Sequence, residues 1–352
     1  MVAVRGLLLP AYARQVNVDV LPTLTAKVRA AVHPGSSVCA CGTDTAVLAD
    51  RPDGTVVRHA DTVAKAHAPD TDAGELAARM AVAAHPSLTG VLLPPLGRIP
   101  QDLPSGSGRT TGLSQHAPGP GTAELHGRLV TFWPYGTPVD PETPEAAPWE
   151  EAATLLARLH QTPESVLPPG LPPMRGPVKA ARAVTRLQAA GPHPAAAPVL
   201  RAWSVLPAWA RDEAPMAHAR TLCHGDLHLG QLVRDPVGAW LLIDIDDLGR
   251  GDPAWDLARP AAWFACGLLP PDEWTRFLTA YQKAAGPAVP ADTDPWPALD
   301  IPARALTVQT GALAIAKAVA AGRPLDEVET AVIDACDRMA AHPPELAPGS
   351  GT

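Results

Sequence analysis

The spacing of apolar and polar residues divides the chain into a strand-rich first part and a helical second part. In the first 130 residues, short runs of apolar residues with polar neighbours are compatible with strands, and Asp53-Gly54 predicts a hairpin turn. The expected strands cover residues 37–49, 55–58, 61–68, 91–93 and 129–133. A helix is expected over 72–84, where Leu76 and Met80 fall on one face. Residues 100–124 are rich in Pro, Gly, Ser and Thr and predict a long loop.

The second part has mainly helical spacing. Helices are expected over 149–160, 176–189 and 195–212, with a strand-and-loop region at 220–247 and further helices from 254 to 340. Asp300 followed by Pro302 predicts the start of one of them. The sequence thus predicts an α+β fold with a small strand-rich lobe and a larger helical lobe. The expected divisions are 1–131 for the first lobe, 132–148 for a connector, 149–343 for the second lobe and 344–352 for a flexible tail.

Composition narrows the classes of function. Of 352 residues, 46% are apolar and 18% are charged, which is enough to build a core and excludes general disorder. The formal net charge of −8 disfavours nucleic acid or an anionic membrane as a partner. The first residues fit neither a signal peptide nor a membrane helix, and the five cysteines are too scattered for a disulfide framework. We therefore expect a cytoplasmic protein.

The densest group of polar residues lies at 224–256. It begins with His224-Gly225-Asp226 and Gln231, and it continues with Asp244 at the end of an apolar run. Asp226, Gln231 and Asp244 together supply two carboxylates and an amide oxygen, and Asp246 and Asp247 follow closely. Oxygen ligands of this kind suit Mg²⁺ when phosphates complete its coordination. The sequence therefore predicts phosphate chemistry in this region.

At these residues the sequence resembles the aminoglycoside phosphotransferase family, which has a protein-kinase-like fold. The family's catalytic loop has the pattern H-x-D followed by Asn; His224 and Asp226 match it, and Gln231 takes the place of the Asn. Residues 251–258 resemble the family's G-D-P-x-x-D-L-A motif, which implies that Asp256 braces the catalytic loop. The run H-G-D-x-H-L-G-Q is more similar to the maltokinase and bacterial glucosamine kinase branch than to the antibiotic-resistance enzymes.

The resemblance implies a bilobal kinase that transfers the γ-phosphoryl group of ATP or GTP to a hydroxyl of a small molecule. It makes Asp226 the catalytic base, with His224 beside it in the catalytic loop, and it makes Gln231 and Asp244 the Mg²⁺ ligands, with Asp246 near the metal. A sugar, amino sugar or aminoglycoside is the expected acceptor. Choline, homoserine and other small alcohols stay open as acceptors, and the oligomeric state is open as well.

The resemblance also assigns nucleotide contacts in the first lobe. Lys65 occupies the place of the lysine that contacts nucleotide phosphates, and Glu75 is the candidate for its ion-pair partner. The stretch that contains Phe132, Trp133 and Tyr135 falls where the family binds adenine through backbone groups. No G-x-G-x-x-G motif occurs, so the segment 42–45 is the candidate for a phosphate-covering loop.

Other interpretations of the same residues stay open. A kinase-fold protein that binds nucleotide or a partner without transfer is one alternative, and a Mg²⁺-dependent phosphatase that uses Asp244 and Asp246 is another. A hydrolase metal site at His224 and His228 is a third, although zinc ligands are usually more regularly spaced. Six residues of the helical lobe are open between packing or capping roles and contact with the acceptor: Trp263, Trp274, Trp296, Asp292, Asp294 and Asp300.

Overall fold

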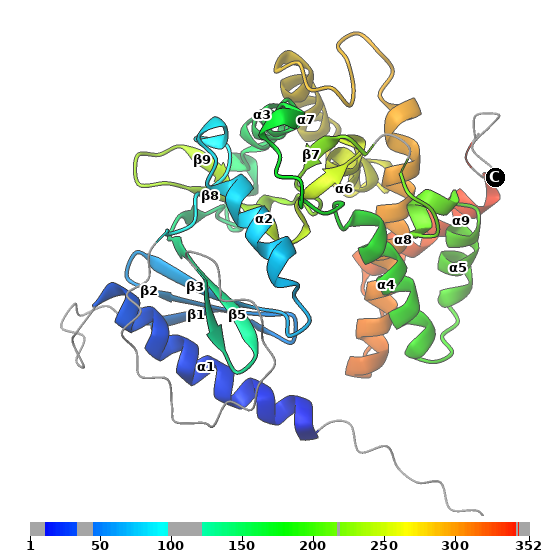
Figure 1. The fold of residues 1–352 in the computed structure, drawn as a ribbon. Helices are drawn as coiled ribbons and strands as arrows, with labels where there is room; N and C mark the ends of the chain where they lie inside the picture. Colours follow the sequence, from blue (N-terminus) through cyan, green and yellow to red (C-terminus); the bar gives the residue numbers. More distant parts are fainter. Residues whose placement is uncertain (1–10, 34–44, 98–121, 217–218, 343, 345–352) are drawn as a thin grey trace, which may run out of the picture. The chain divides into compact units, whose positions relative to one another are not determined.

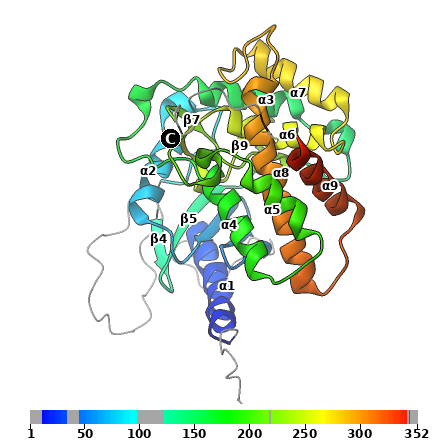
Figure 2. The ribbon, with the colours of Figure 1, turned by 90° about the vertical axis from the view of Figure 1, so that its right-hand side faces the viewer.

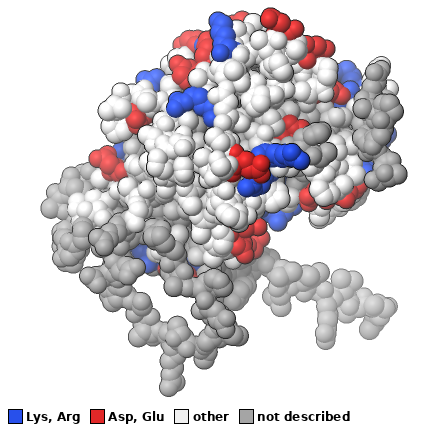
Figure 3. Space-filling view, turned by 45° about the horizontal axis from the view of Figure 1, so that its top comes forward, with Lys and Arg blue, Asp and Glu red and all other residues white. Residues whose placement is uncertain are grey.

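The computed structural model describes residues 11–33, 45–97, 122–216, 219–342 and 344 (Figure 1). The chain divides into two compact units, residues 1–137 with 235–237 and residues 138–234 with 238–352. No helix in the described segments is both long and apolar enough to cross a membrane. Acidic and basic side chains are interspersed on the molecular face that Figure 3 presents.

An antiparallel sheet with the strand order β1-β2-β3-β5-β4 forms the centre of the first unit. Its strands are β1 (Thr45–Arg51), β2 (Gly54–His59), β3 (Thr62–His67), β4 (Thr122–Leu125) and β5 (Arg128–Pro134). The strands predicted at 55–58, 61–68 and 129–133 are confirmed. The loop predicted over 100–124 ends earlier than expected, because β4 already begins at Thr122.

A helix that the sequence analysis did not predict packs on this sheet. Helix α1 (Ala11–Val32) lies along one face of the strands in Figure 1. Its fully buried Val20, Leu24 and Val28 repeat every four residues, and they join strand residues such as Val57 and Phe132 in one apolar core. The sequence pattern hides this helix because Pro22 interrupts it. Burial against the sheet stabilises the helix despite the proline.

Helix α2 (Ala73–Ala83) confirms the helix expected at 72–84. The Asp72 side chain accepts a hydrogen bond from the Glu75 backbone N–H, which caps the first turn. The strand predicted at 91–93 is wrong: these residues follow a 3₁₀ turn at Pro86–Leu88 and lie outside the named strands. They are buried all the same, and burial is the property that the apolar run correctly indicated.

Helices make up most of the second unit, as predicted. They are α3 (Trp149–His160), α4 (Gly176–Ala189), α5 (Ala196–Ser204), α6 (Ala254–Ala265), α7 (Pro271–Lys283), α8 (Trp296–Ala321) and α9 (Glu327–Ala341). Helix α8 packs against α4, α5, α6 and α9, and Figure 2 shows α4, α5 and α8 side by side. The helix start predicted at Asp300 is wrong, because α8 begins at Trp296 and continues through Pro302. Asp300 instead pairs with Arg304 one turn later, at an Oδ1–Nε distance of 2.8 Å.

Short antiparallel strands fix the two loops that carry the polar cluster. They are β7 (Thr221–Cys223), β8 (Leu232–Arg234), β9 (Trp240–Leu242) and β10 (Gly249–Gly251), and a two-residue strand, β6, covers Thr137–Pro138. Cys223 pairs with Gly249, and Leu232 pairs with Leu242. These pairings bring the loop at 224–231 next to the loop at 243–248.

Candidate active site

Two basic side chains bind the Asp226 carboxylate, one at each of its oxygens. Lys179, on α4, places its Nζ 2.6 Å from Asp226 Oδ2. Arg259, on α6, places Nη2 2.5 Å from Asp226 Oδ1 and donates from Nε to the Leu227 carbonyl oxygen at 3.0 Å. The Asp226 side chain keeps 19% of its exposure, so the carboxylate is held in place but still open to solvent.

The same lysine also binds a second carboxylate. Lys179 Nζ lies 2.7 Å from Asp247 Oδ2, so one ammonium group bridges Asp226 and Asp247. Sequence reasoning placed Asp247 in a loop near the metal and assigned no role to Lys179 or Arg259. The one signal that pointed to Lys179 is the scarcity of lysine in the chain, where arginine is the usual basic residue.

The charges around Asp226 set its protonation. Burial raises the pKa of the Asp226 carboxyl, but the attraction of Lys179 and Arg259 outweighs burial and leaves the pKa below its ordinary value. Burial lowers the pKa of Lys179, and the two neighbouring carboxylates more than reverse this effect. For Asp247 burial dominates over Lys179, so its pKa is raised. Of the two carboxyls, Asp226 therefore has the lower pKa.

Gly225 is required by the conformation of this loop. Its φ of +86° lies in the region that favours glycine, and a Cβ atom at this position would collide with the Asp247 carbonyl oxygen. That carbonyl already accepts a hydrogen bond from the Arg175 N–H at 3.2 Å, which limits how far it can move. The glycine thus allows the segments around Asp226 and Asp247 to approach closely.

We expect Gly225→Ala to lower the free energy of unfolding by about 1–3 kcal/mol through backbone strain, and further through the collision with Asp247. Gly238→Ala is the matched control, because Gly238 has a φ of +93° but nothing within 4 Å of the added methyl group. Urea denaturation of both variants measures the difference. Equal losses in the two variants would contradict a close approach at Gly225.

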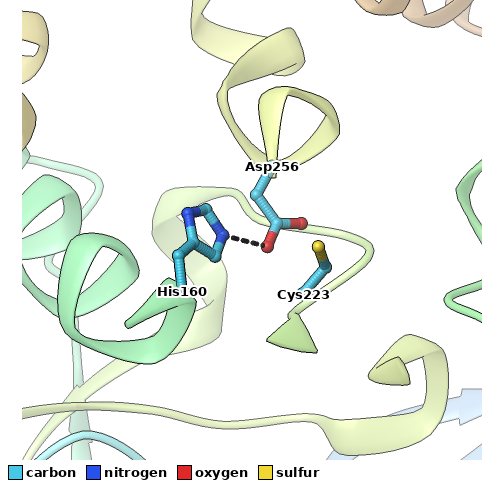
Figure 4. A group of neighbouring side chains, drawn as sticks. All are labelled: His160, Cys223 and Asp256. Atoms are coloured by element: carbon cyan, nitrogen blue, oxygen red, sulfur yellow. Dashed lines mark hydrogen bonds and ion pairs between the residues drawn. The ribbon is translucent and has the colours of Figure 1, made fainter. Parts of the chain in front are cut away.

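Asp256 braces the loop at 224–231 through hydrogen bonds to its backbone, as the family resemblance implied. Its Oδ2 accepts from the His224 backbone N–H at 2.6 Å, and its Oδ1 accepts from the Gly225 N–H at 2.7 Å. Figure 4 shows the third contact, in which His160 Nε2 lies 3.0 Å from Asp256 Oδ2. Because a carboxylate can only accept, this contact places a proton on His160 Nε2. The Tyr281 hydroxyl holds the other ring nitrogen of His160 at 2.8 Å.

Cys223 completes a buried group with His160 and Asp256 whose ligand atoms lie close enough for a metal ion (Figure 4). The chemistry of the group does not fit that role. Burial raises the pKa of the Cys223 thiol well above its ordinary value, whereas metals bind the thiolate. Both Asp256 oxygens are occupied by backbone N–H groups. The group is therefore a structural brace.

His224 lies within the protein rather than at its surface. The ring is fully buried, and Nε2 makes a 2.8 Å contact with the Ile243 carbonyl oxygen at the end of β9. This contact links the two loops of the site. His228 is half-buried. Burial and the nearby Arg259 lower its pKa, although Asp226 opposes them, and this favours the neutral ring.

Gln231 ends the first of these loops, and Asp244 and Asp246 lie on the second. Gln231 Nε2 is 3.5 Å from Asp244 Oδ2, and the Asp244 Oδ1 atom accepts from the Asp246 N–H at 3.4 Å. Asp244 takes a left-handed backbone conformation with φ of +63°, two residues after the end of β9. The amide of Gln231 can be flipped, which exchanges its nitrogen and oxygen and directs the amide oxygen toward the Asp244 carboxylate. This oxygen-rich set fits a divalent cation such as Mg²⁺.

The nucleotide residues expected in the first unit have these places. Lys65 lies on β3, and Glu75 lies in the first turn of α2, where its Oε2 is 3.2 Å from Arg79 Nη1. The pairing of Glu75 with Lys65 stays a prediction. Most of the phosphate loop expected at 42–45 lies outside the described residues.

The residues expected to contact adenine lie at the end of β5. The Phe132 side chain is buried in the apolar core, and its carbonyl oxygen accepts from the Leu96 N–H at 2.9 Å. Trp133 donates from Nε1 to Thr131 Oγ1 at 2.9 Å. The Tyr135 N–H donates to the Asp61 carbonyl oxygen at 2.8 Å. These groups thus already have partners within the protein, and adenine binding here stays a prediction.

The open acceptor candidates separate into two groups. Trp274 and Trp296 stack on Phe264 with ring centroids 5.5 and 6.3 Å away, so both pack within the helical unit. Asp294 accepts from the Trp296 N–H at 3.1 Å at the start of α8, and Asp292 has a φ of +60° in the turn before it. In contrast, half-buried Trp263 lines a cavity beside the catalytic loop.

One family model and several solved structures match this chain. The model of a phosphotransferase enzyme family matches residues 112–299. No curated protein sequence matches the chain significantly. Among solved structures, a choline/ethanolamine kinase family protein from Mesorhizobium loti has 17% sequence identity and a TM-score of 0.51, with 90% of this chain and 94% of that chain covered.

Two further structures show the same fold. An amicoumacin kinase in complex with AMP-PNP, Ca²⁺ and Ami has 16% identity and a TM-score of 0.56, over 85% of this chain and 89% of that chain. A thermostable mutant of an aminoglycoside phosphotransferase, in a ternary complex with AMP-PNP and hygromycin B, has 14% identity and a TM-score of 0.53. The match covers 90% of this chain and 98% of that chain. These similarities confirm the predicted α+β, kinase-like fold.

Proposed function

The chain belongs to the phosphotransferase enzyme family, and we propose that it transfers the γ-phosphoryl group of ATP or GTP to a hydroxyl of a small sugar, amino sugar or aminoglycoside-like acceptor. The single observation that carries this proposal is the arrangement of Asp226 between Lys179 and Arg259, with Gln231 on the same loop and Asp244 on the neighbouring loop. Kinases with this fold that bind AMP-PNP together with an antibiotic acceptor support it.

Asp226 acts as the base that orients the acceptor hydroxyl and accepts its proton. Each carboxylate oxygen has two lone pairs, and the bonds to Lys179 and Arg259 use one on each, so an oxygen can still accept from a hydroxyl. A low pKa makes Asp226 a weak base, but phosphoryl transfer through a loose transition state depends mainly on positioning. His224 is a positioning residue, because its buried ring ties the loop to Ile243.

Gln231 and Asp244, with Asp246 beside them, are the residues that would hold Mg²⁺. When bound, the ion neutralises charge on the phosphate oxygens. Lys65 in the first unit is proposed to contact the nucleotide phosphates, with Glu75 as the candidate partner.

Lys179→Met should shift the acid limb of the kcat/KM–pH profile to higher pH. The base must be ionised to act. Burial raises the pKa of Asp226 and the charge of Lys179 lowers it, so removal of Lys179 raises this pKa. Lys179→Arg keeps the charge and should keep the limb near its wild-type position. Lys283→Met removes an exposed lysine at the end of α7 and is the matched control. An unshifted acid limb in Lys179→Met would show that Lys179 does not act on the base.

The proposed function is tested by ADP or GDP release with Mg²⁺ over a panel of neutral sugars, amino sugars, aminoglycosides and choline-like alcohols. We expect release that requires both the cation and one acceptor class. Nucleotide binding without release for every acceptor would favour the kinase-fold binding protein instead. Phosphate release from phosphate esters without nucleotide would favour the phosphatase alternative at Asp244 and Asp246.

A further inference from the structure

A cavity of about 260 Å³ lies beside the catalytic loop, within the second unit. Its walls come from the first turn of α3, from residues 227–230 of the catalytic loop and from α6. The lining is mainly apolar, with the indoles of Trp149 and Trp263 among aliphatic residues such as Leu227 and Pro260. An apolar cavity with a few polar groups next to reactive residues is the usual form of a ligand site.

Arg259 connects this cavity to the proposed base. Its side chain lines the cavity, and its guanidinium also binds Asp226 Oδ1. A second, much smaller recess is lined by Asp226, Lys179 and Gln309, and it shares Arg259 and Leu227 with the cavity. A molecule whose hydroxyl reaches Asp226 can therefore extend another part into the apolar cavity.

The charges in these walls disfavour a cationic acceptor. Among the described residues that line the two spaces, Asp226 is the sole carboxylate, and Lys179 and Arg259 already neutralise it. Two acids on α3 and α7, Glu150 and Glu273, do not line either space and have partners of their own. Glu150 binds Arg276 through two hydrogen bonds of 2.6 and 2.8 Å, and Glu273 accepts from Trp149 Nε1 at 2.6 Å.

His228 adds no negative or positive charge to the wall. Its Nδ1 accepts from the Gly230 N–H at 3.0 Å, which fits the neutral ring. An ammonium group buried here would meet the Arg259 guanidinium without a free counter-charge, and such burial is costly. An uncharged ring would instead stack on the half-buried indole of Trp263.

Resting on the proposed function, we propose that this cavity is an acceptor subsite that binds an uncharged ring with an apolar face, attached to the part of the acceptor that carries the phosphorylated hydroxyl. This places neutral glycosides and similar ring-bearing alcohols ahead of polyamine aminoglycosides and quaternary ammonium alcohols. Trp263 is the residue that determines this preference, because it lines the cavity and no other aromatic side chain stacks on its ring among the described residues.

The test compares the dissociation constants of four probes measured by calorimetry: methyl β-D-glucopyranoside, phenyl β-D-glucopyranoside, the 4-(aminomethyl)phenyl analogue and kanamycin. We expect the neutral phenyl probe to bind at least about 10-fold more tightly than the methyl probe, which corresponds to the stacking of one ring. The aminomethyl analogue should lose this advantage, and kanamycin should bind no more tightly than the methyl probe. Equal binding of the phenyl and methyl probes, or tightest binding of a cationic probe, would overturn the inference.

Three variants test whether the tighter binding of the phenyl probe comes from this cavity. Trp263→Ala should abolish the phenyl advantage, and Trp263→Phe should keep most of it. Trp203→Ala removes another half-buried tryptophan, on α5 and away from the cavity, and should leave the advantage unchanged. Melting temperatures of all variants separate loss of fold from loss of the subsite. A phenyl advantage that survives in folded Trp263→Ala would contradict the role of this cavity.

ADP release measured on the same samples distinguishes the two proposals. If phenyl binding depends on Trp263 but no acceptor is phosphorylated, the proposed function is contradicted and the binding site is supported. Transfer to kanamycin, without any phenyl preference, would remove this inference and keep the proposed function.

Discussion

Asp226→Asn should lower kcat by about 10²–10⁴-fold, the usual contribution of a positioned acid–base group. The amide keeps the size of the side chain but cannot take the hydroxyl proton. The two cations keep partners in this variant, because Lys179 still binds Asp247 and Arg259 still donates to the Leu227 carbonyl. The fold should therefore persist, and nucleotide affinity should change little.

Steady-state ADP release and a melting curve check this prediction together. Asp337→Asn is the matched control, since Asp337 is 62% exposed and pairs with Arg201 on the surface. Such surface pairs contribute about 0–1 kcal/mol, so the control should keep wild-type rates. Turnover of Asp226→Asn near the wild-type rate would remove Asp226 from the reaction.

Asp256→Ala should have the largest effect on stability, with a loss of about 3–5 kcal/mol in the free energy of unfolding. Asp256 is 2% exposed, and its removal leaves the N–H groups of His224 and Gly225 without their acceptor. Each buried donor without a partner costs about 1–3 kcal/mol. Such a loss is a large fraction of a typical protein's total stability of about 5–15 kcal/mol.

Chemical denaturation measures this loss, and Asp300→Ala serves as the comparison. Asp300 makes a partly exposed ion pair with Arg304 within α8, so its removal should cost no more than about 1 kcal/mol. A loss in Asp256→Ala no larger than in Asp300→Ala would mean that the hydrogen bonds under the catalytic loop contribute little.

Features that depend on local sequence could be predicted well. The helix at 149–160 was predicted with its observed bounds because its apolar residues have helical spacing, and the polar cluster at 224–256 was found because its residues are adjacent in sequence. Helix α1 was missed because Pro22 interrupts its pattern and because its stabilising partner is a sheet formed later in the chain.

The residues that complete the site depend on tertiary structure. Arg259 comes 33 residues after Asp226, and Lys179 lies on a separate helix, so no spacing rule connects either of them to the base. Trp263, Trp274 and Trp296 were indistinguishable in the sequence as well. Packing distinguishes them, because two of these rings stack on Phe264 while the third lines a cavity.

The most direct test of the central claim is a ³¹P NMR spectrum of the enzyme incubated with ATP, Mg²⁺ and the acceptor that the panel selects. We expect a phosphomonoester signal from the acceptor that grows in step with ADP, and that grows at least about 100-fold more slowly when Asp226→Asn replaces the wild type. ATP that is bound but unchanged, or ATP that yields only ADP and inorganic phosphate, would contradict phosphoryl transfer to an acceptor hydroxyl at Asp226.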